Sequence, residues 1–305
     1  LTPSSHTTLD AVTLQEYLHE FAVQGAEFAC IEASSHGLDQ GRLQGTPIEV
    51  AMFSNLTRDH LDYHQTMAHY AAAKARLFDP VRFPSLASAI VNADDPQSAV
   101  LTSHMPDTLP VWRYSQQANG GAEFRVVDAE YQLTGAVLTI VTPDGPKVLN
   151  SPLLGKFNVS NLLAAVAAAR ALGLSWESVQ SAVPQLQGAP GRMQVVDDPD
   201  RLLVVDYAHT PDALQQVLSS LRPHTAGQLR VVFGCGGDRD RGKRPLMTEI
   251  ALNHADHVLL TSDNPRSEPI GRILDDMIAT LDESQLARIQ VQQDRRMAIR
   301  QAVSQ

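Results

Sequence analysis

Cysteine and aromatic residues are scarce in this sequence, and it contains no long apolar run. Its 305 residues include two cysteines, Cys30 and Cys235, without Cys-x-x-Cys spacing. This argues against a disulfide framework or a cysteine-based zinc site and fits two reduced thiols in the cytosol. No run approaches the ~20 apolar residues that a membrane-spanning helix needs. Because a signal-peptide pattern is also missing, we expect a cytoplasmic protein without a membrane partner.

Positive charge is also in short supply. The 24 lysines and arginines are outnumbered by 34 aspartates and glutamates, which gives a formal net charge of −10. Nucleic-acid binding needs a basic face that neutralises phosphates, so the composition argues against a nucleic-acid partner. A local basic cluster could still bind a small anion. The length predicts roughly two domains.

Strand-like and helix-like segments alternate along most of the chain, which predicts an α/β fold with a parallel sheet. From about 111 to 154, short alternating runs and a Pro-Asp-Gly-Pro turn at Pro143 indicate a small antiparallel excursion. A Gly/Pro cluster at Gln187 predicts a boundary between domains 1–187 and 188–305. The renewed alternation after it is typical of a small doubly wound sheet. The expected strands are 28–33, 50–54, 89–93, 202–206, 229–234 and 257–261, and the expected helices are 14–25, 67–78, 158–172, 175–183, 211–221, 245–254, 270–281 and 297–305.

A dense polar cluster follows the expected strand 50–54. It contains His60 and His64, and Glu32 holds a similar place at the end of the strand 28–33. Ligands of open α/β sheets bind beyond the carboxyl ends of strands, so a carboxylate and an imidazole there suit magnesium. Helix capping by such residues is the alternative. Zinc is less favoured because no His-Glu-x-x-His motif is present.

Lys74 lies on the expected Ala-rich helix 67–78. A lysine in such a place is usually a surface residue with a partly buried stem. The alternative is a partly buried amine with a lowered pKa. A neutral amine reacts with carbon dioxide to give a carbamate, whose oxygen atoms could bind magnesium. The residues themselves leave both interpretations open.

Two further clusters follow expected strands in the second domain. The Gly-rich turn 233–245 is typical of a phosphate cradle at a helix start, but it is no Walker A motif because Gly-Lys precedes Arg244. The run 262–266 ends in Arg266, whose planar fork suits a carboxylate, and an Asx-Pro turn is the alternative. Four basic residues in the turn favour an anionic ligand, with a solvated basic loop as the alternative: Arg239, Arg241, Lys243 and Arg244.

Six segments, in order and at compatible spacing over nearly the whole chain, resemble the Mur ligase family and most closely its MurE type. They are Glu32-Ala-Ser-Ser-His-Gly-Leu, Asn55-Leu-Thr-Arg-Asp-His-Leu-Asp-Tyr-His, Gly155-Lys-Phe-Asn-Val-Ser-Asn-Leu-Leu-Ala-Ala, Asp206-Tyr-Ala-His-Thr-Pro-Asp-Ala-Leu, Gly234-Cys-Gly-Gly-Asp-Arg-Asp and Asp263-Asn-Pro-Arg.

The resemblance implies a Mur ligase central ATPase-type domain with a parallel sheet, followed by a Rossmann-like C-terminal domain, both incomplete. It also implies a reaction of peptidoglycan precursor synthesis, which serves cell shape and division. ATP phosphorylates the carboxylate of UDP-N-acetylmuramoyl-L-alanyl-D-glutamate, and the amine of meso-diaminopimelate attacks the acyl phosphate. Since diaminopimelate carries one carboxylate more than lysine, a bidentate pair with Arg266 would select it.

The resemblance assigns roles to individual positions. The implied Mg²⁺ ligands are Glu32, His60 and Lys74 as its carbamate. Five positions match those that hold the UDP-muramoyl-dipeptide: Thr7, Thr8, Ser34, Gln40 and Arg42. His6, beside them, stands where relatives often have Asn. Four match ATP contacts: Asn158, Asn161, Arg192 and Asp206. Five match the site of the incoming amino acid: Arg239, Asp263, Asn264, Pro265 and Arg266.

Some parts of the family pattern are missing from the sequence. The N-terminal uridine-binding domain and a P-loop would precede Leu1, and a Gly-Lys-Gly-His-Glu segment would follow Gln305. Because the P-loop lysine stabilises the γ-phosphate, we expect this chain alone to be nearly inactive. We also expect a monomer.

The sequence also allows other functions. A lysine-adding ligase and a folylpolyglutamate synthase share the fold, but the run 263–266 and the Glu32 segment argue against them. Two alternatives come from other classes. One is a metal-dependent hydrolase that uses His36, His60 and His64, and the other is a non-catalytic nucleotide-binding module.

Overall fold

The computed structural model describes residues 6–57, 59–103, 105–198 and 200–304. Arg58, inside one of the six segments above, lies outside the described residues. The chain forms two compact units, which are described separately. Unit 1 comprises 1–128, 138–149 and 159–182. Unit 2 comprises 129–137, 150–158 and 183–305.

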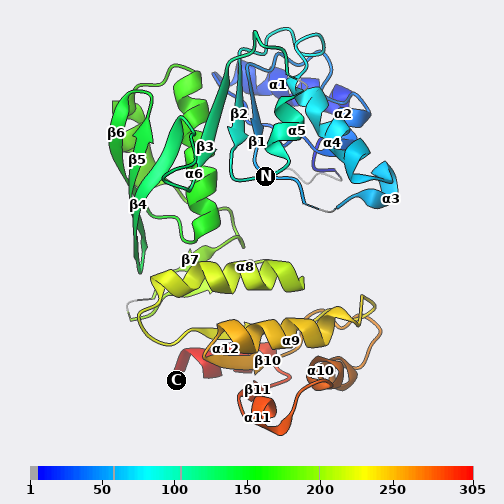
Figure 1. Ribbon diagram of the computed structural model, residues 1–305. Helices are drawn as coiled ribbons and strands as arrows, with labels where there is room; N and C mark the ends of the chain where they lie inside the picture. Colours follow the sequence, from blue (N-terminus) through cyan, green and yellow to red (C-terminus); the bar gives the residue numbers. More distant parts are fainter. Residues whose placement is uncertain (1–5, 58, 104, 199, 305) are drawn as a thin grey trace. The chain divides into compact units, whose positions relative to one another are not determined.

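A six-stranded sheet runs through the first half of the chain (Figure 1). Its strands follow each other in sequence order, and the first four pair in parallel. Alternate positions of the later strands are buried, as a sheet with one covered face requires. The strands are β1 (Val50–Phe53), β2 (Ser88–Asn92), β3 (Val111–Ser115), β4 (Phe124–Gln132), β5 (Gly135–Thr142) and β6 (Gly145–Ser151).

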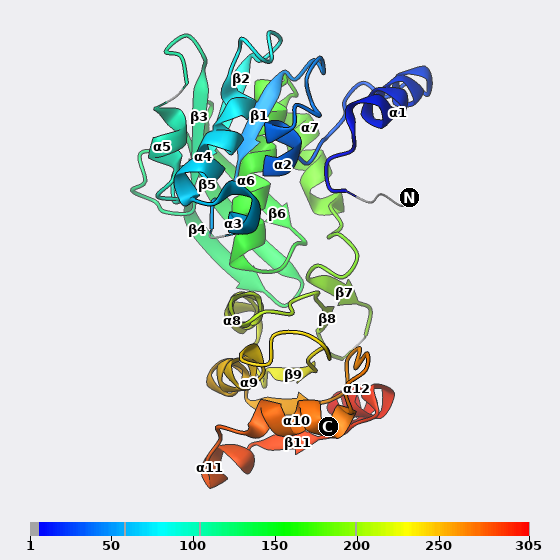
Figure 2. The same ribbon diagram turned by 90° about the vertical axis from the view of Figure 1, so that its right-hand side faces the viewer.

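Short helices surround the candidate site in unit 1. Helices α2 and α3 both pack against α4, and Figure 2 shows the three grouped near β1. Helix α4 begins at a Thr66 cap, whose hydroxyl accepts a hydrogen bond from the amide of His69. The helices of this part of the chain are α1 (Ala11–Val23), α2 (Ser35–Asp39), α3 (Leu61–His64), α4 (Met67–Ala75), η1 (Arg76–Phe78), α5 (Ser98–Thr102), α6 (Lys156–Ala171) and α7 (Trp176–Ala182). The first turn of α6 and the short η2 (Val183–Gln185) belong to unit 2.

Unit 2 is built on a three-stranded parallel sheet in the order β11-β10-β9. Two further strands, β7 and β8, pair antiparallel. Helix α9 packs against α8, α10 and β10, and α12 packs against β9 and β10. The elements are β7 (Gln194–Val196), β8 (Leu203–Val205), α8 (Pro211–Leu221), η3 (Arg222–His224), β9 (Arg230–Phe233), α9 (Lys243–His254), β10 (His257–Leu260), α10 (Ile270–Ile278), α11 (Glu283–Leu286), β11 (Ile289–Val291) and α12 (Arg295–Ser304).

The parallel α/β architecture is confirmed, and two local expectations are wrong, those for the segments 28–33 and 202–206. The segment 28–33 forms no strand, and Phe28 is 56% exposed, because no described strand pairs with it. Within the stretch 111–154, β3 and β4 extend the main sheet in parallel, whereas β4, β5 and β6 follow one another across two-residue turns, so the expected antiparallel excursion is confined to these last three strands. The strand expected at 202–206 exists as β8 but pairs with β7, outside the three-stranded sheet. Among the described helices, none has the length and apolar character to cross a membrane.

His224 joins three segments within unit 2. Its side chain is buried, Nε2 lies 2.9 Å from the amide nitrogen of Gly155, and Nδ1 lies 2.6 Å from the carbonyl oxygen of Gln132. An amide can only donate, so Nε2 accepts and Nδ1 carries the proton. Gly155 is needed here, because its φ is +89° and an added Cβ would lie 3.1 Å from Cβ of Ser220. The imidazole therefore fixes the chain just before α6.

We expect His224→Ala to lower the free energy of unfolding of unit 2 by about 2–4 kcal/mol, because it leaves two buried backbone groups unpaired. His224→Asn can keep a hydrogen-bond donor to Gln132, so its free energy of unfolding should lie between those of wild type and His224→Ala. The exposed His257→Ala is the matched control. Denaturant unfolding followed by circular dichroism measures all three. A His224→Ala variant as stable as the His257→Ala control would contradict this account.

Candidate active site

The carboxyl ends of β1 and β2 are tied together where the polar cluster begins. The side-chain amide of Asn92 donates to the carbonyl of Ser54 (2.8 Å), and the amide of Leu56 donates to the carboxylate of Asp95 (3.1 Å). Adjacent parallel strands end at one edge of a sheet, so these bonds fix the path of the chain that leads to His60.

Lys74 lies half-buried on α4 near two carboxylates. Burial lowers the pKa of Lys74 from its ordinary value, while the negative charges of Glu32 and Asp59 raise it. The amine lies 5.4 Å from the centre of the Tyr70 ring. A site of this kind favours the neutral amine more than water does. The structure therefore brings Lys74 within electrostatic reach of Glu32.

Four rings pack around this corner. His60 lies edge-on to His36 at 4.9 Å and to Tyr70 at 5.8 Å between ring centres. Its backbone is left-handed, with φ at 54°. His64 stacks on Tyr70 at 5.3 Å, and burial lowers its pKa, with a further contribution from His36. Tyr70 therefore brings His60 and Lys74, two of the three predicted metal ligands, to the same corner.

The donor atoms of this corner fit magnesium only in part. Among the residues that the structure describes, His, Cys, Asp and Glu form no group of three that could hold a metal ion. His36, His60 and His64 therefore do not make the three-ligand site that a zinc hydrolase needs. Glu32 and His60 supply two donors, and a carbamate on Lys74 would add the oxygen ligand that Mg²⁺ prefers. Within the described part of the chain, His64 Nε2 is buried without a hydrogen-bond partner.

Thr8 holds the backbone that leads from Glu32 to Ser34. The buried hydroxyl of Thr8 donates to the carbonyl of Glu32 (2.7 Å) and accepts from the amide of Ser34 (2.8 Å). The hydroxyl of Ser34 caps α2 by accepting from the amide of Gly37 (3.1 Å). A Cβ on Gly37 would lie 2.8 Å from Thr8. Thr8 thus braces Glu32 from inside, whereas Thr7 is exposed.

Arg42 and Gln40 form the polar surface beside this brace. Arg42 donates from Nε and Nη2 to the side-chain oxygen of Gln40 (2.9 and 2.6 Å) and from Nη1 to the carbonyl of Thr8 (2.8 Å). Four of the five predicted dipeptide-binding residues therefore belong to one connected network: Thr8, Ser34, Gln40 and Arg42.

Three further residues, Asp39, Tyr63 and Arg76, join this network but were not predicted from the sequence. The hydroxyl of Tyr63 donates to Asp39 (2.7 Å), and this hydrogen bond, with the charge of Arg76, lowers the pKa of the Asp39 carboxyl. Arg76 forms an ion pair with Asp39 at 2.6 Å. Tyr63 and Arg76 are 24 and 37 positions from Asp39, so local pattern could not reveal the contact.

The predicted ATP contacts belong to two places in the chain. Asn158, in the first turn of α6, donates from its side chain to the carbonyl of Leu154 (2.8 Å), and Asn161 lies exposed one turn further on. The carboxylate of Asp206 accepts from the amides of Met193 and Ala208, both at 2.8 Å.

The exposed guanidinium of Arg192 lies over the Tyr207 ring at 5.0 Å, next to Asp206. An arginine on an aromatic face beside a carboxylate can contact phosphate or ribose. Met193 connects this place to the start of α6, since its Cε lies 3.3 Å from where a Cβ on Gly155 would be.

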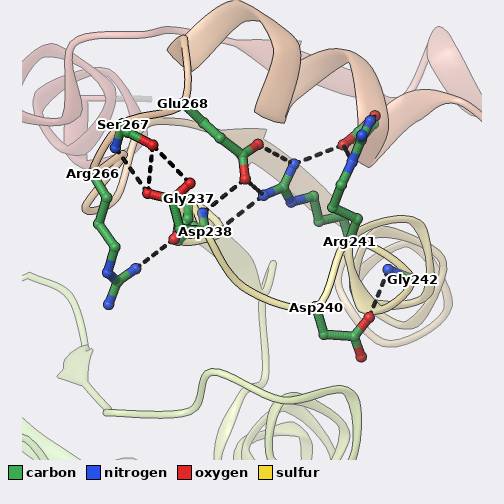
Figure 3. Close-up of polar contacts among 11 residues, drawn as sticks. Gly237, Asp238, Asp240, Arg241, Gly242, Arg266, Ser267 and Glu268 are labelled. Atoms are coloured by element: carbon green, nitrogen blue, oxygen red, sulfur yellow. Dashed lines mark hydrogen bonds and ion pairs between the residues drawn. The ribbon is translucent and has the colours of Figure 1, made fainter.

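The Gly-rich turn of unit 2 lies directly on the segment 263–268 (Figure 3). The amide of Gly237 donates to the carbonyl of Asn264 (2.9 Å), and Nη1 of Arg266 donates to the carbonyl of Gly237 (2.7 Å). Added Cβ atoms would lie 2.2 Å from a backbone oxygen at Gly234 and 1.8 Å at Gly237, so only glycine allows this approach. The structure thus places three of the five predicted amino-acid-binding residues, Asn264, Pro265 and Arg266, against the Gly-rich turn.

Two of the four basic residues expected to bind an anion have a different role. Arg241 pairs with Asp276 (2.7 Å), and the fully buried Arg244 pairs with Glu268 (2.9 Å) and Asp276 (2.7 Å). Lys243 donates to the carbonyl of His209 (2.6 Å). Arg239 is exposed, as are Asp263, Asn264 and Arg266. The basic turn is therefore mainly an internal ion-pair network, and the expectation of a four-residue anion site is wrong.

Comparison with known proteins places these features in a family. Residues 1–169 match the Mur ligase middle domain, and residues 191–305 match the Mur ligase glutamate ligase domain. The chain is 48% identical over 303 residues to the UDP-N-acetylmuramoyl-L-alanyl-D-glutamate--2,6-diaminopimelate ligase of Synechococcus elongatus, covering 98% of this chain and 59% of that protein. The Pseudomonas aeruginosa protein of the same name is 48% identical over 273 residues, which cover 89% of this chain and 55% of that one.

A solved structure of a UDP-N-acetylmuramoyl-L-alanyl-D-glutamate--2,6-diaminopimelate ligase is 51% identical, with a TM-score of 0.78. That match covers 100% of this chain and 62% of the other. The folylpolyglutamate synthase of Mycobacterium tuberculosis, 22% identical with a TM-score of 0.63, shares the fold. The chain thus spans 59–62% of the length of the relatives that it matches over nearly its whole extent.

The environment of Lys74 can be measured directly. An NMR titration of its side chain should give a pKa below the ordinary 10.5, because burial disfavours the cation. Glu32→Gln should lower this pKa further, since the carboxylate of Glu32 raises it. Glu49→Gln, an exposed glutamate of the same unit, serves as the control. An unchanged or higher pKa in Glu32→Gln would show that the two side chains are not close.

Proposed function

This chain belongs to the Mur ligase family, and we propose that its activity is the ATP-dependent addition of meso-diaminopimelate to UDP-N-acetylmuramoyl-L-alanyl-D-glutamate. One observation carries the choice of amino acid: the Gly-rich turn holds Arg266 through Gly237 with its guanidinium at the surface, in a chain 48% identical to a diaminopimelate ligase. The enzyme is proposed to be a cytoplasmic monomer with domains 1–187 and 188–305.

The corner around Lys74 is the proposed magnesium site. Glu32, His60 and carbamylated Lys74 would hold the ion, which supplies positive charge to the transferring phosphoryl group. The protein prepares the site by keeping the amine half-buried, so that it is more easily neutral, and by fixing Glu32 through Thr8. Tyr70 packs against both His60 and Lys74 and limits their movement.

The network beside this corner is the proposed site for the UDP-muramoyl-dipeptide. Ser34, Gln40 and Arg42 present polar groups at the edge of α2, and Thr7 lies exposed next to the buried Thr8. Gln40 Oε1 orients Arg42, since it accepts from two of its nitrogens. An arginine held in this way suits a carboxylate or phosphate of the substrate.

Asn158, Asn161, Arg192 and Asp206 are the proposed ATP contacts. Asp206 is fixed by two backbone amides, and the cation–π contact with Tyr207 orients Arg192. These contacts order the side chains before ligand arrives, which reduces the entropy lost on binding.

The proposed amino-acid site reads the distal carboxylate of meso-diaminopimelate. Nη1 of Arg266 is engaged with Gly237, which orients the rest of the guanidinium fork for a carboxylate. Asp263 and Asn264 would receive the amino group, and the exposed Arg239 would face the other carboxylate. Lysine, which lacks the distal carboxylate, would leave Arg266 without its ligand.

Carbamylation of Lys74 can be tested in the chain itself. With ¹³C-bicarbonate, we expect a side-chain carbamate signal by ¹³C NMR that grows with pH, because only the neutral amine reacts. Mg²⁺ should strengthen the signal, and Lys74→Arg should abolish it. The exposed Lys156→Arg serves as the control and should retain it. A signal that survives in Lys74→Arg would refute the assignment.

Amino-acid choice can be tested by calorimetric binding to the chain. We expect wild type to prefer meso-diaminopimelate to lysine, and Arg266→Ala to weaken diaminopimelate binding about 10–100-fold, the worth of a bidentate charged pair. The affinity of Arg266→Ala for ATP should stay within about twofold of the wild-type affinity, since Arg266 contacts no part of ATP in the proposed site. The exposed Arg272→Ala is the control. Equal loss of both ligands would count against the assignment, and equal binding of lysine and diaminopimelate by wild type would favour a lysine-adding ligase.

A further inference from the structure

Arg244 is the largest fully buried polar side chain in the described part of unit 2, with no exposed surface. It lies in the first turn of α9, and its guanidinium donates to both carboxylate oxygens of Glu268 (2.9 and 3.0 Å) and to Asp276 (2.7 Å). Burial of a charge is costly unless it is paired and hydrogen-bonded, so such a cluster persists only with its partners in place.

The same guanidinium contacts both loops of the proposed amino-acid site. Nη2 of Arg244 donates to the carbonyl of Gly236 (3.2 Å) in the Gly-rich turn. Glu268, at the end of the other loop, also accepts from the amide of Asp238 (2.7 Å). Figure 3 shows Glu268 between Asp238 on one side and Arg241 on the other. Arg244 and Glu268 thus form a two-residue clamp that closes one loop onto the other.

The loops need such a clamp because both carry strained backbone. Asp238 and Arg266 have φ values of 53° and 50°, in the left-handed region that costs a non-glycine residue about 1–2 kcal/mol. Strain of this kind persists where surrounding contacts determine the conformation. The carboxylate of Asp238 accepts from the amide and hydroxyl of Ser267 (3.0 and 2.8 Å), and these bonds join the two strained positions.

The orientation of Arg266 follows from this arrangement. Its Nη1 donates to the carbonyl of Gly237, which lies between Gly236, held by Arg244, and Asp238, held by Glu268. In Figure 3 the side chain of Arg266 extends away from Glu268 while one of its nitrogens remains bonded to Gly237. A shift of Gly237 would therefore move the guanidinium.

We propose that Arg244, through Glu268, is a positioning residue that sets the guanidinium of Arg266 and so determines selectivity for an amino acid with a second, distal carboxylate. This rests on the proposed function, in which Arg266 reads that carboxylate. Arg244 itself contacts no substrate. Its planar fork serves two carboxylates and a carbonyl at once, which a lysine cannot do.

Arg241 provides a matched comparison. It also pairs with Asp276, through two hydrogen bonds of 2.8 and 2.7 Å, but it makes no hydrogen bond to Glu268 or to the 263–268 segment among the contacts of the described chain. A substitution at Arg241 therefore removes an ion pair of the same network without releasing the clamp. A change in amino-acid preference that follows substitution of either arginine reflects the stability of the ion-pair network. A change that follows substitution of Arg244 alone reflects the position of the loops.

The test uses the chain with Arg244→Lys, Glu268→Gln and Arg241→Lys. Calorimetry gives the affinities for meso-diaminopimelate and lysine, and NMR of the Arg266 guanidinium reports its environment without ligand. We expect Arg244→Lys and Glu268→Gln each to reduce the preference for meso-diaminopimelate about tenfold and to shift the Arg266 signals, while Arg241→Lys changes neither. Glu268→Gln keeps the test decisive if Arg244→Lys does not fold.

The outcomes separate this inference from the proposed function. Unshifted Arg266 signals and an unchanged preference in folded Arg244→Lys and Glu268→Gln would overturn the inference, even if Arg266→Ala abolishes the preference. Equal effects in Arg241→Lys would overturn it as well, because they would show a general loss of stability. If wild type shows no preference for meso-diaminopimelate, the proposed function fails, whereas shifted Arg266 signals would still support the clamp.

Discussion

The first candidate site depends on the partial burial of one amine. Lys74 lies against the Tyr70 ring, near the negative charges of Glu32 and Asp59, and burial lowers its pKa despite those charges. The surroundings follow from the sheet, because the parallel pairing of β1 with β2 places both strand ends at one edge, and Asn92 and Asp95 then fix the chain that leads to His60. Thr8 and α2 bring Glu32 to the same corner from a segment that belongs to no described strand. The proposed reactive amine and the two proposed metal donors thus come from three segments that are far apart in the sequence.

The candidate site of unit 2 depends on a different feature, the exposed Arg266, whose guanidinium is bonded to the backbone of the neighbouring loop. Loops are usually mobile, but here glycines let two loops approach to backbone contact, and a buried guanidinium pairs with carboxylates beneath them. Arginine suits the buried position because it stays charged and offers several donors in one plane. Two of the four basic residues that suggest an anion site in the sequence, Arg241 and Arg244, form ion pairs with carboxylates of the protein itself. Besides the paired Arg241, the exposed arginines of the two loops are Arg266 and Arg239.

Much of the fold and of the site could be predicted from the sequence, and the failures have physical causes. Helices such as α4 and α8 follow from periodicity and Thr caps, and β1, β2, β9 and β10 follow from short apolar runs. The segment 28–33 has the composition of a strand, but a strand forms only where a partner pairs with it. The roles of Glu32, His60, Lys74 and Arg266 come from resemblance to a family, and they stay predictions. Asp39, Tyr63 and Arg76 escaped, as did the pairing of Arg244 with Glu268, because each contact joins residues more than 20 positions apart.

The central claim is that Glu32, His60 and Lys74 together hold a divalent ion. Paramagnetic Mn²⁺, titrated into the chain in bicarbonate buffer and followed by NMR, tests it most directly, because Mn²⁺ accepts the same oxygen and imidazole ligands as Mg²⁺ and broadens the signals of nearby nuclei. The account predicts that signals of His60, Tyr70 and Lys74 broaden first, and that removal of bicarbonate weakens the effect. Broadening that begins elsewhere on this acidic protein, with His60 and Lys74 unaffected, would contradict it.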